Sequence, residues 1–174
     1  MAKISEFDIM LRRRLRRDVV LVLLMVLACY IWWFRSTHNL LSLVNAAKSN
    51  DLERINSCVK WGAPVNGVVR WGWDASPGNT PLTSAIWPKH LDAVKLLVRL
   101  GADVNLEDGF SMTPAGTAAC SGDIAIINYL AEQGADFVVK SGQFTPLEWA
   151  SNSRSPKPEV LAAIRKILEP QWAD

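Results

Sequence analysis

A period of 33 residues runs through most of this chain and constrains the fold more than any other feature of the sequence. Thr-Pro pairs begin at residues 80, 113 and 145, and Gly-Ala pairs begin at residues 62, 101 and 134. Between each Thr-Pro and the next Gly-Ala, the sequence indicates a helix, a turn and a second helix. A unit of this size cannot bury its apolar face alone, so successive units are expected to stack into a solenoid.

The repeated residues have clear structural roles. A threonine followed by proline is typical of a helix start, because the hydroxyl caps a backbone N–H and proline needs no donor in the first turn. The outer helix of the second unit shows apolar residues at helical spacing, namely Leu91, Val94, Leu97 and Val98. We expect each outer helix to end at the glycine of a Gly-Ala pair, because glycine adopts the left-handed conformation most easily.

Four segments of this pattern resemble the ankyrin repeat: residues 40–66, 79–105, 112–138 and 144–170. The second matches the family motif best, through Thr80, Pro81, Leu82, Ala85, Val94, Leu97, Gly101, Ala102, Asp103, Val104 and Asn105. The first lacks Thr-Pro, and the fourth departs from the pattern at "SNSRSPKP". The resemblance implies an all-α ankyrin-repeat solenoid over residues 35–170 with irregular end units as caps, followed by a short tail, residues 171–174.

The N-terminal segment differs from the repeats. Residues 1–18 contain six Lys and Arg residues, and residues 19–34 contain no charged residue. Sixteen apolar residues are short for a membrane span, but flanking arginines and interfacial aromatic residues compensate. We predict a transmembrane signal-anchor helix at 19–34, with a cytoplasmic N-terminus and the repeats on the periplasmic or extracytoplasmic side of a single-pass cell membrane protein. An alternative is a lipoprotein anchored through Cys29, because "VLAC" resembles a lipidation box.

The remaining composition gives little support to catalysis or metal binding. The chain has three cysteines without a CxxC pair and two histidines, and the repeats carry almost balanced charge. We therefore predict no enzyme activity, cofactor, metal site, nucleic-acid partner or small-molecule substrate. Cys58 and Cys120 are expected to be free and mostly buried, because two repeats separate them. His90 is expected to form a hydrogen bond at a helix start, and Trp61 to pack.

The stretch "VVRWGWDASPGN" lengthens the loop between the first two repeats. The step from Asn66 to Thr80 is fourteen residues, whereas the step from Asn105 to Thr113 is eight. In the ankyrin family this loop is a projecting finger, so Arg70, Trp71 and Trp73 are predicted to lie near its tip. Either these tryptophans bind a partner or they cover the first inner helices as a lid.

The resemblance implies further contact residues on the fingers and the inner helices. The predicted partner-binding set is Arg70, Trp71, Trp73, Trp87, Phe110, Met112 and Phe144. The predicted function is a membrane-tethered protein–protein interaction module, and small bacterial proteins of this appearance suggest an immunity or inhibitor protein for an exported toxin. The alternative is a structural or assembly subunit of a membrane complex.

Overall fold

The computed structural model describes residues 6–69, 78–153 and 156–169, and for residues 6–17 and 31–38 it describes the backbone alone. The chain divides into two compact units, Met1–Thr37 and His38–Asp174. All named elements of the described residues are α-helices, and the β structure among them is one isolated bridge between Ser141 and Phe144. The predicted all-α class is confirmed.

Helix α1 (Glu6–Lys48) includes the whole of the predicted anchor segment. All side chains of residues 18–30 are exposed, and the large apolar ones have exposed fractions between 53 % and 68 %. Within the part of the chain that the structure describes, no helix combines the length and the apolarity needed to cross a membrane. The predicted span at 19–34 is therefore not supported, and its residues 31–34 lie outside those whose side chains are described.

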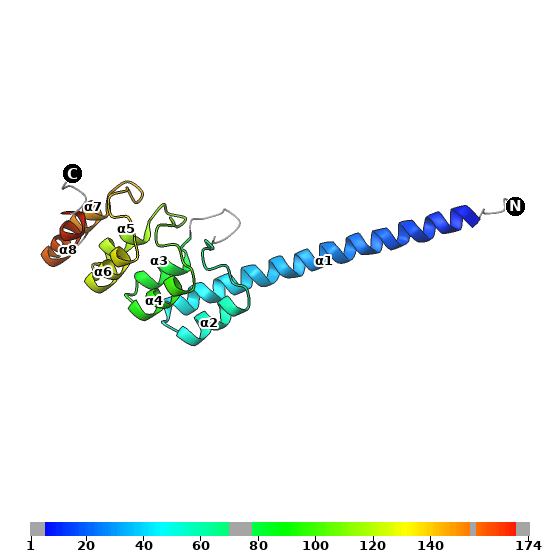
Figure 1. Cartoon of the computed structure of the whole chain (residues 1–174), viewed down its shortest axis with the longest axis horizontal. Coiled ribbons are helices and arrows are strands. Elements are labelled where there is room, and N and C mark those ends of the chain that lie inside the picture. Colours follow the sequence, from blue (N-terminus) through cyan, green and yellow to red (C-terminus); the bar gives the residue numbers. More distant parts are fainter. Residues whose placement is uncertain (1–5, 70–77, 154–155, 170–174) are drawn as a thin grey trace. The chain divides into compact units, whose positions relative to one another are not determined.

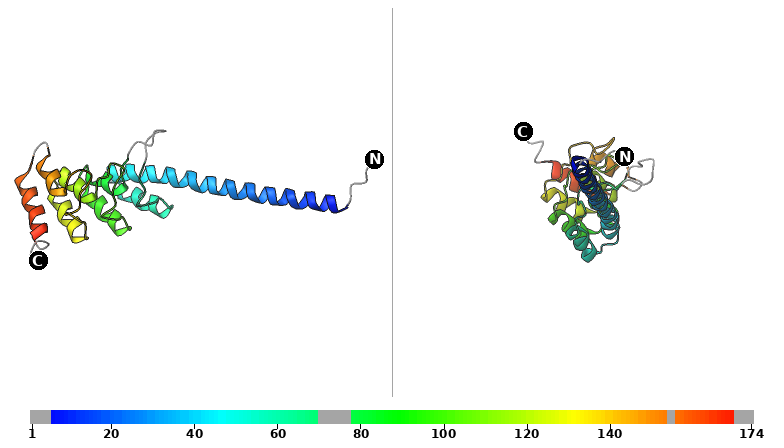
Figure 2. Two further views of the ribbon diagram at one scale, coloured as in Figure 1. Left: turned by 90° about the horizontal axis from the view of Figure 1, so that it is seen from above. Right: turned by 90° about the vertical axis from the view of Figure 1, so that its right-hand side faces the viewer.

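The second unit is a stack of helical pairs (Figures 1 and 2). The outer row contains α2 (Leu52–Lys60), α4 (Leu91–Arg99), α6 (Ile124–Glu132) and α8 (Pro158–Leu168). The inner row contains α3 (Pro81–Ile86), α5 (Pro114–Ser121) and α7 (Pro146–Ser151). Each of these helices contacts its neighbours in the same row, and each of these inner helices contacts the outer helix that follows it in sequence. The stack is therefore the predicted solenoid of helix–turn–helix units.

The first inner position of the stack is occupied by the last part of α1. Leu43, Ala46 and Ala47 belong to the core and are at most 1 % exposed. This explains why the first repeat lacks a Thr-Pro pair. Its inner helix does not begin there but continues from the preceding residues, and a proline inside a helix costs about 3 kcal/mol.

The three Thr-Pro pairs begin inner helices, as predicted. In each case the threonine hydroxyl accepts a hydrogen bond from the backbone N–H three residues later, at 3.1 to 3.3 Å: Thr80, Thr113 and Thr145. In two helices the side chain of that later residue, Thr83 or Glu148, accepts a hydrogen bond from the backbone N–H of the capping threonine in return. A cap of this kind stabilises a helix by about 1 kcal/mol.

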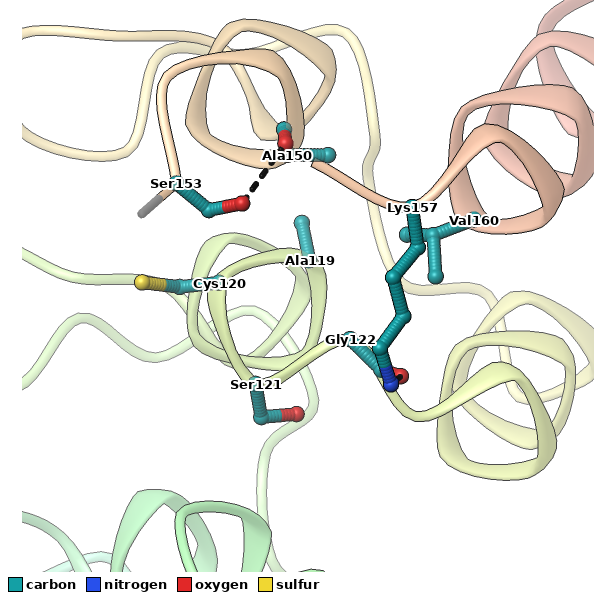
Figure 3. A pocket seen from close by; sticks show the side chains of 8 residues that line it. All are labelled: Ala119, Cys120, Ser121, Gly122, Ala150, Ser153, Lys157 and Val160. Atoms are coloured by element: carbon teal, nitrogen blue, oxygen red, sulfur yellow. Dashed lines mark hydrogen bonds between the residues drawn. The ribbon is translucent and has the colours of Figure 1, made fainter. Parts of the chain in front are cut away.

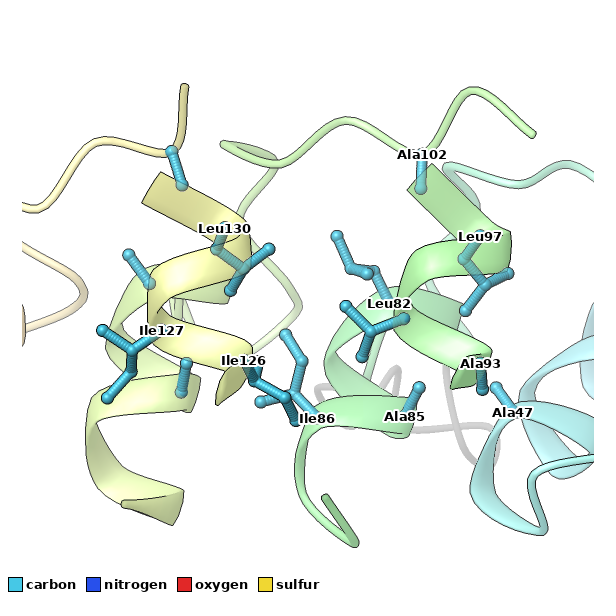
Figure 4. Packing of buried hydrophobic residues seen from close by; sticks show 14 of the residues in the cluster. Ala47, Leu82, Ala85, Ile86, Ala93, Leu97, Ala102, Ile126, Ile127 and Leu130 are labelled. Atoms are coloured by element: carbon cyan, nitrogen blue, oxygen red, sulfur yellow. The ribbon is translucent and has the colours of Figure 1, made fainter. Parts of the chain in front are cut away.

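The core lies between the two rows of helices. Figure 4 shows Ala47 close to Ala93 at the junction of the first two repeats, and Ile86 beside Ile126 at the next junction. All four side chains are fully buried. The small alanines allow neighbouring helices to approach, and the isoleucines fill the wider space. The predicted stripe on α4 is confirmed, since Val94 and Leu97 are fully buried and Leu91 and Val98 half-buried.

The ends of the helices confirm the predictions for the glycines and for His90. Gly62, Gly101 and Gly134 follow outer helices with φ of 86°, 93° and 82°, in the left-handed region. His90, at the start of α4, forms a hydrogen bond as predicted, although its side chain makes no cap hydrogen bond to its own helix. Its Nε2 lies 3.1 Å from the carbonyl oxygen of Lys48 instead, so His90 joins two repeats.

The three cysteines are free thiols. Cys58 is buried and Cys120 half-buried, as predicted, while Cys29 is exposed on α1. The solenoid is thus stabilised by packing and hydrogen bonds rather than by cross-links.

Candidate functional site

Three loops connect successive repeats, and we call them the first finger (residues 62–79), the second finger (residues 101–112) and the third finger (residues 134–144). Each finger is closed by a hydrogen bond from a backbone N–H to the carbonyl oxygen of the residue before Thr-Pro. The pairs are Val69 with Asn79 at 3.2 Å, Asp108 with Met112 at 2.9 Å, and Ser141 with Phe144 at 2.8 Å. The extra residues of the first finger come between its closing pair in the sequence. The predicted site residues Arg70, Trp71 and Trp73 lie outside the described residues.

The tip of the second finger is organised by the carboxylate of Asp108. Its Oδ1 accepts hydrogen bonds from the backbone N–H of Phe110 at 2.8 Å and of Met112 at 3.0 Å. Ser111 has a φ of 56°, which turns the chain sharply between these two donors. The second finger also contacts the first, because Gly109 N–H donates to the Gly78 carbonyl at 2.7 Å. Phe110 is therefore fixed on an ordered turn, with 56 % of its side chain exposed.

Burial affects the ionisation of Asp108. Desolvation raises the pKa of its carboxyl, while hydrogen bonds from Met112, Phe110 and Thr83 lower it and only partly offset the rise. Such an acid is costly to bury unless its hydrogen bonds are satisfied. We conclude that Asp108 has a structural role, because its acceptor capacity is used to shape the turn that presents Phe110.

The third finger uses a different residue at the same place. Ser141 is fully buried, and its Oγ accepts a hydrogen bond from the Thr113 N–H at 2.7 Å. The Ser141 carbonyl accepts the indole N–H of Trp149 at 2.7 Å. Phe144 packs edge-on against Trp149, with 5.1 Å between the ring centroids. Phe144 is half-buried by this contact, so it supports the finger more than it offers free surface.

A ladder of asparagine side chains joins the bases of the fingers. Asn66 Oδ1 accepts the Asp103 N–H at 2.9 Å, and its Nδ2 donates to the Gly101 carbonyl at 3.2 Å. One repeat later, Asn105 makes the same two bonds to Asp136 N–H and the Gly134 carbonyl, at 2.8 and 3.2 Å. The ladder fixes the register of each finger relative to the next.

The ladder ends at the third finger, where valine stands in the asparagine position. Val138 and Val139 are 44 % and 54 % exposed. Their backbone N–H groups both donate to Asp136 Oδ1, at 2.7 and 3.0 Å, so this turn is ordered. Sequence analysis missed these residues. The signal was the replacement of the repeated asparagine by an apolar residue.

Only part of the predicted site forms one surface. The second and third fingers are adjacent, since a side chain on Gly142 would lie 3.6 to 3.9 Å from the carbonyl oxygens of Ser111 and Phe110. Met112 is half-buried, with its sulfur 3.8 Å from Ser141 Oγ. Trp87 is 47 % exposed but follows the last residue of α3, at the end of that helix remote from the fingers.

Trp61 corrects another prediction. It was expected to pack, but 67 % of its side chain is exposed at the end of α2. Its carbonyl accepts a hydrogen bond from the Asn39 side chain at 3.1 Å, so the backbone rather than the indole contributes to the fold. Trp61 belongs to the first repeat and is separate in the chain from the second and third fingers.

A small hollow of about 40 Å³ lies between α5, α7 and the start of α8 (Figure 3). Burial raises the pKa of the Cys120 thiol, which therefore stays protonated at neutral pH and is a poor nucleophile. Figure 3 shows the sulfur pointing away from Lys157, whose Nζ donates to the Gly122 carbonyl at 3.4 Å. The described residues contain no group of three His, Cys, Asp or Glu side chains placed to hold a metal ion.

Comparison with known proteins agrees with this architecture. Residues 77–109, which include the second helical pair and most of the second finger, match the family model of the ankyrin repeat. The chain is an ankyrin repeat protein. It is 31 % identical over 128 residues to BRCA1-associated RING domain protein 1 of Caenorhabditis elegans, and the matched region covers 73 % of this chain and 16 % of the relative. It is 33 % identical over 98 residues to inversin of Homo sapiens, and this matched region covers 56 % of this chain and 9 % of the relative.

The chain thus spans less than a fifth of the length of these curated relatives. What they share with it is the repeat itself, and ankyrin repeats indicate a protein–protein interaction module. Within the ankyrin repeat protein, the adjacent second and third fingers expose Phe110, Val138 and Val139 on ordered turns. We call this the finger surface.

Proposed function

We propose that this ankyrin repeat protein binds a partner protein on its finger surface. The observation that supports the proposal is the exposure of Phe110 and Val139 on turns that hydrogen bonds hold in place. Exposed apolar side chains on adjacent loops favour association, because burying them removes apolar area from water. Turns that are already ordered lose little conformational entropy on binding.

Binding energy at such a surface is expected to be concentrated in few residues. An aromatic side chain near the centre of an interface is a typical hot spot, whose truncation costs about 2 kcal/mol or more. Phe110 is the aromatic residue of the finger surface and has the largest exposed fraction there. Its loss is therefore expected to weaken binding about thirtyfold, which corresponds to about 2 kcal/mol.

The test compares full-length native chain with a Phe110→Ala, Val139→Ala double variant as bait in host extracts, with bound proteins quantified by mass spectrometry. Trp61→Ala is the matched control, since it removes an aromatic side chain that is even more exposed but lies off the finger surface. We expect a partner that binds the native chain and the control but not the double variant. A partner retained equally by all three baits would refute the proposed surface.

We also propose that the protein acts by binding rather than by catalysis. The protonated Cys120 thiol and the backbone-bound Lys157 in the small hollow support this view. The carboxylate of Asp108 accepts hydrogen bonds from backbone N–H groups of its own turn. These groups shape the fold, and none is placed beside a second reactive group.

We further propose that residues 19–34 tether the chain to a membrane. Consecutive apolar side chains from Val19 to Leu27 are exposed on every side of α1. A helix that packs against one protein surface keeps a polar face, and this stretch has none. Lipid would cover all sides at once, and the arginines of residues 12–17 would then meet the headgroups. The short length of the stretch is the feature that opposes full spanning.

Membrane extraction tests the tether. Membranes from cells producing the full chain are washed with alkaline carbonate, and the pellet and supernatant are compared by immunoblotting. We expect native chain in the pellet and a Leu23→Arg, Val26→Arg variant in the supernatant, since each arginine near a helix centre costs about 2.5–3.5 kcal/mol in a membrane. Ser49→Arg, outside the apolar stretch, is the control. Native chain in the supernatant would refute the tether.

The extracytoplasmic location and the neutralisation of an exported toxin remain predictions from the sequence. Protease protection of intact cells tests the first. The partner identified with the finger-surface variants tests the second.

A further inference from the structure

The charges of the second and third fingers are almost all negative. These two segments contain Asp103, Glu107, Asp108 and Asp136, with Lys140 as their basic residue. The inner helices α3 and α5, which begin at the fingers, contain no charged residue. The basic side chains of the repeats are instead frequent on outer helices, for example Arg54, Lys60, Lys95, Arg99, Arg165 and Lys166.

The acidic and apolar groups belong to the same turns. Asp136 accepts the N–H groups of Val138 and Val139, so its carboxylate lies at the base of the two exposed valines. Glu107 is exposed, three residues before Phe110, and makes no hydrogen bond or ion pair with any residue that the structure describes. Hydrogen bonds from Thr145 lower the pKa of the Glu148 carboxyl, and the positive charge of Lys140 lowers it further.

We infer that the finger surface recognises a basic and apolar segment of its protein partner, in which Lys or Arg side chains face Glu107 and aliphatic or aromatic side chains cover Phe110 and Val139. This inference rests on the proposed function of the finger surface. Opposite charges steer the encounter and suppress wrong partners, because juxtaposed like charges are unfavourable. An acidic segment would be repelled, as would the phosphates of a nucleic acid.

The test uses a random-peptide display library panned against the full chain in detergent micelles, at low and at high ionic strength. We expect selected peptides to be enriched in Lys or Arg together with Leu, Phe or Trp, and to be lost at high salt. Binding of the selected peptides is expected to fall about tenfold for Glu107→Lys, corresponding to about 1.4 kcal/mol, and about thirtyfold for Phe110→Ala, corresponding to about 2 kcal/mol. Both positions are exposed, so folding is expected to be retained and is checked by circular dichroism.

Glu132→Lys is the matched charge control, because Glu132 is an exposed acid on outer helix α6. It is expected to change binding less than about twofold, as a charge outside the interface is largely screened. Glu107→Gln distinguishes the loss of attraction from the added repulsion, and an intermediate effect is expected.

The outcomes separate the inference from the proposed function. Peptides that need Phe110 but lack basic residues, or that bind Glu107→Lys unchanged, would overturn the basic segment and leave the finger surface intact. Peptides that bind Phe110→Ala and Val139→Ala unchanged would overturn both. Selection of no peptide that depends on the fingers would count against both as well.

Discussion

Gly116 connects the packing of the stack to the shape of the finger surface, and its replacement by alanine gives a sharp prediction. It lies in α5, three residues after the cap Thr113. A Cβ at this position would overlap with Ser141 Oγ and approach Ser141 Cβ to 2.5 Å. Ser141 has no free space to move into, because it is fully buried and bonded to Thr113, Phe144 and Trp149.

The expected magnitude follows from three opposing contributions. Replacing glycine by alanine in a helix interior normally stabilises it by about 1 kcal/mol. Overpacking in a tight site costs about 1–3 kcal/mol. If Ser141 moves, the Thr113 N–H loses its acceptor, which costs about 1–3 kcal/mol more. We therefore expect Gly116→Ala to lower the free energy of unfolding by about 3 kcal/mol, opposite in sign to the usual effect.

Urea unfolding of the full chain, followed by tryptophan fluorescence and circular dichroism, measures this change as a lower midpoint at unchanged slope. Ser141→Gly is introduced alone and together with Gly116→Ala. If the clash is the cause, Gly116→Ala will cost much less in the Ser141→Gly background, as contacting residues are not additive. Equal cost in both backgrounds, or a Gly116→Ala variant as stable as native chain, would refute the reasoning.

Other consequences of the structure are tested by similar measurements. Asn105→Ala removes two ladder bonds and is expected to lower stability by about 1–2 kcal/mol, whereas Val138→Ala, after the ladder ends, is expected to change it by less than about 0.5 kcal/mol in urea unfolding. Phe110→Ala is expected to be equally mild, despite its effect on binding, because the side chain is exposed. Hydrogen bonds from Thr145 lower the pKa of the Glu148 carboxyl below its ordinary value of 4.5. Native chain is therefore expected to have a larger free energy of unfolding than Glu148→Gln above pH 4.5, and to lose this difference as the pH falls through the lowered pKa. Unfolding curves at several pH values check this, and an advantage that persists in acid would contradict it.

The repeats were predictable because the residues that define them act locally. A threonine caps the helix that follows it, and Gly101 or Gly134 ends the helix before it, so both can be inferred from neighbouring residues. The sequence predicted a hydrogen bond for His90 but not its partner, because Lys48 is 42 residues away in sequence. The same limitation hid the role of Gly116, whose requirement for glycine comes from Ser141 in the next finger.

The candidate site was predicted less completely than the fold, for a related reason. The sequence indicated exposed aromatic residues on the fingers, and Phe110 is confirmed as one. Phe144 has the same chemistry, but it packs edge-on against Trp149 and is half-buried. Exposure depends on which neighbour packs against a side chain, and periodicity does not determine this.

The third finger combines several departures from the pattern of the earlier repeats. It has valine in place of the ladder asparagine, and Ser141 in place of Asp108. Ser141 leaves no room for a side chain at position 116, so this position is glycine where the previous repeat has Thr83. Local departures of this kind are expected where function competes with regular stacking. The serine and glycine together fix the third finger against α5, and the valine makes its outer side apolar. The finger that ends the ladder is thus both firmly attached and exposed, which are the two properties that a binding surface requires.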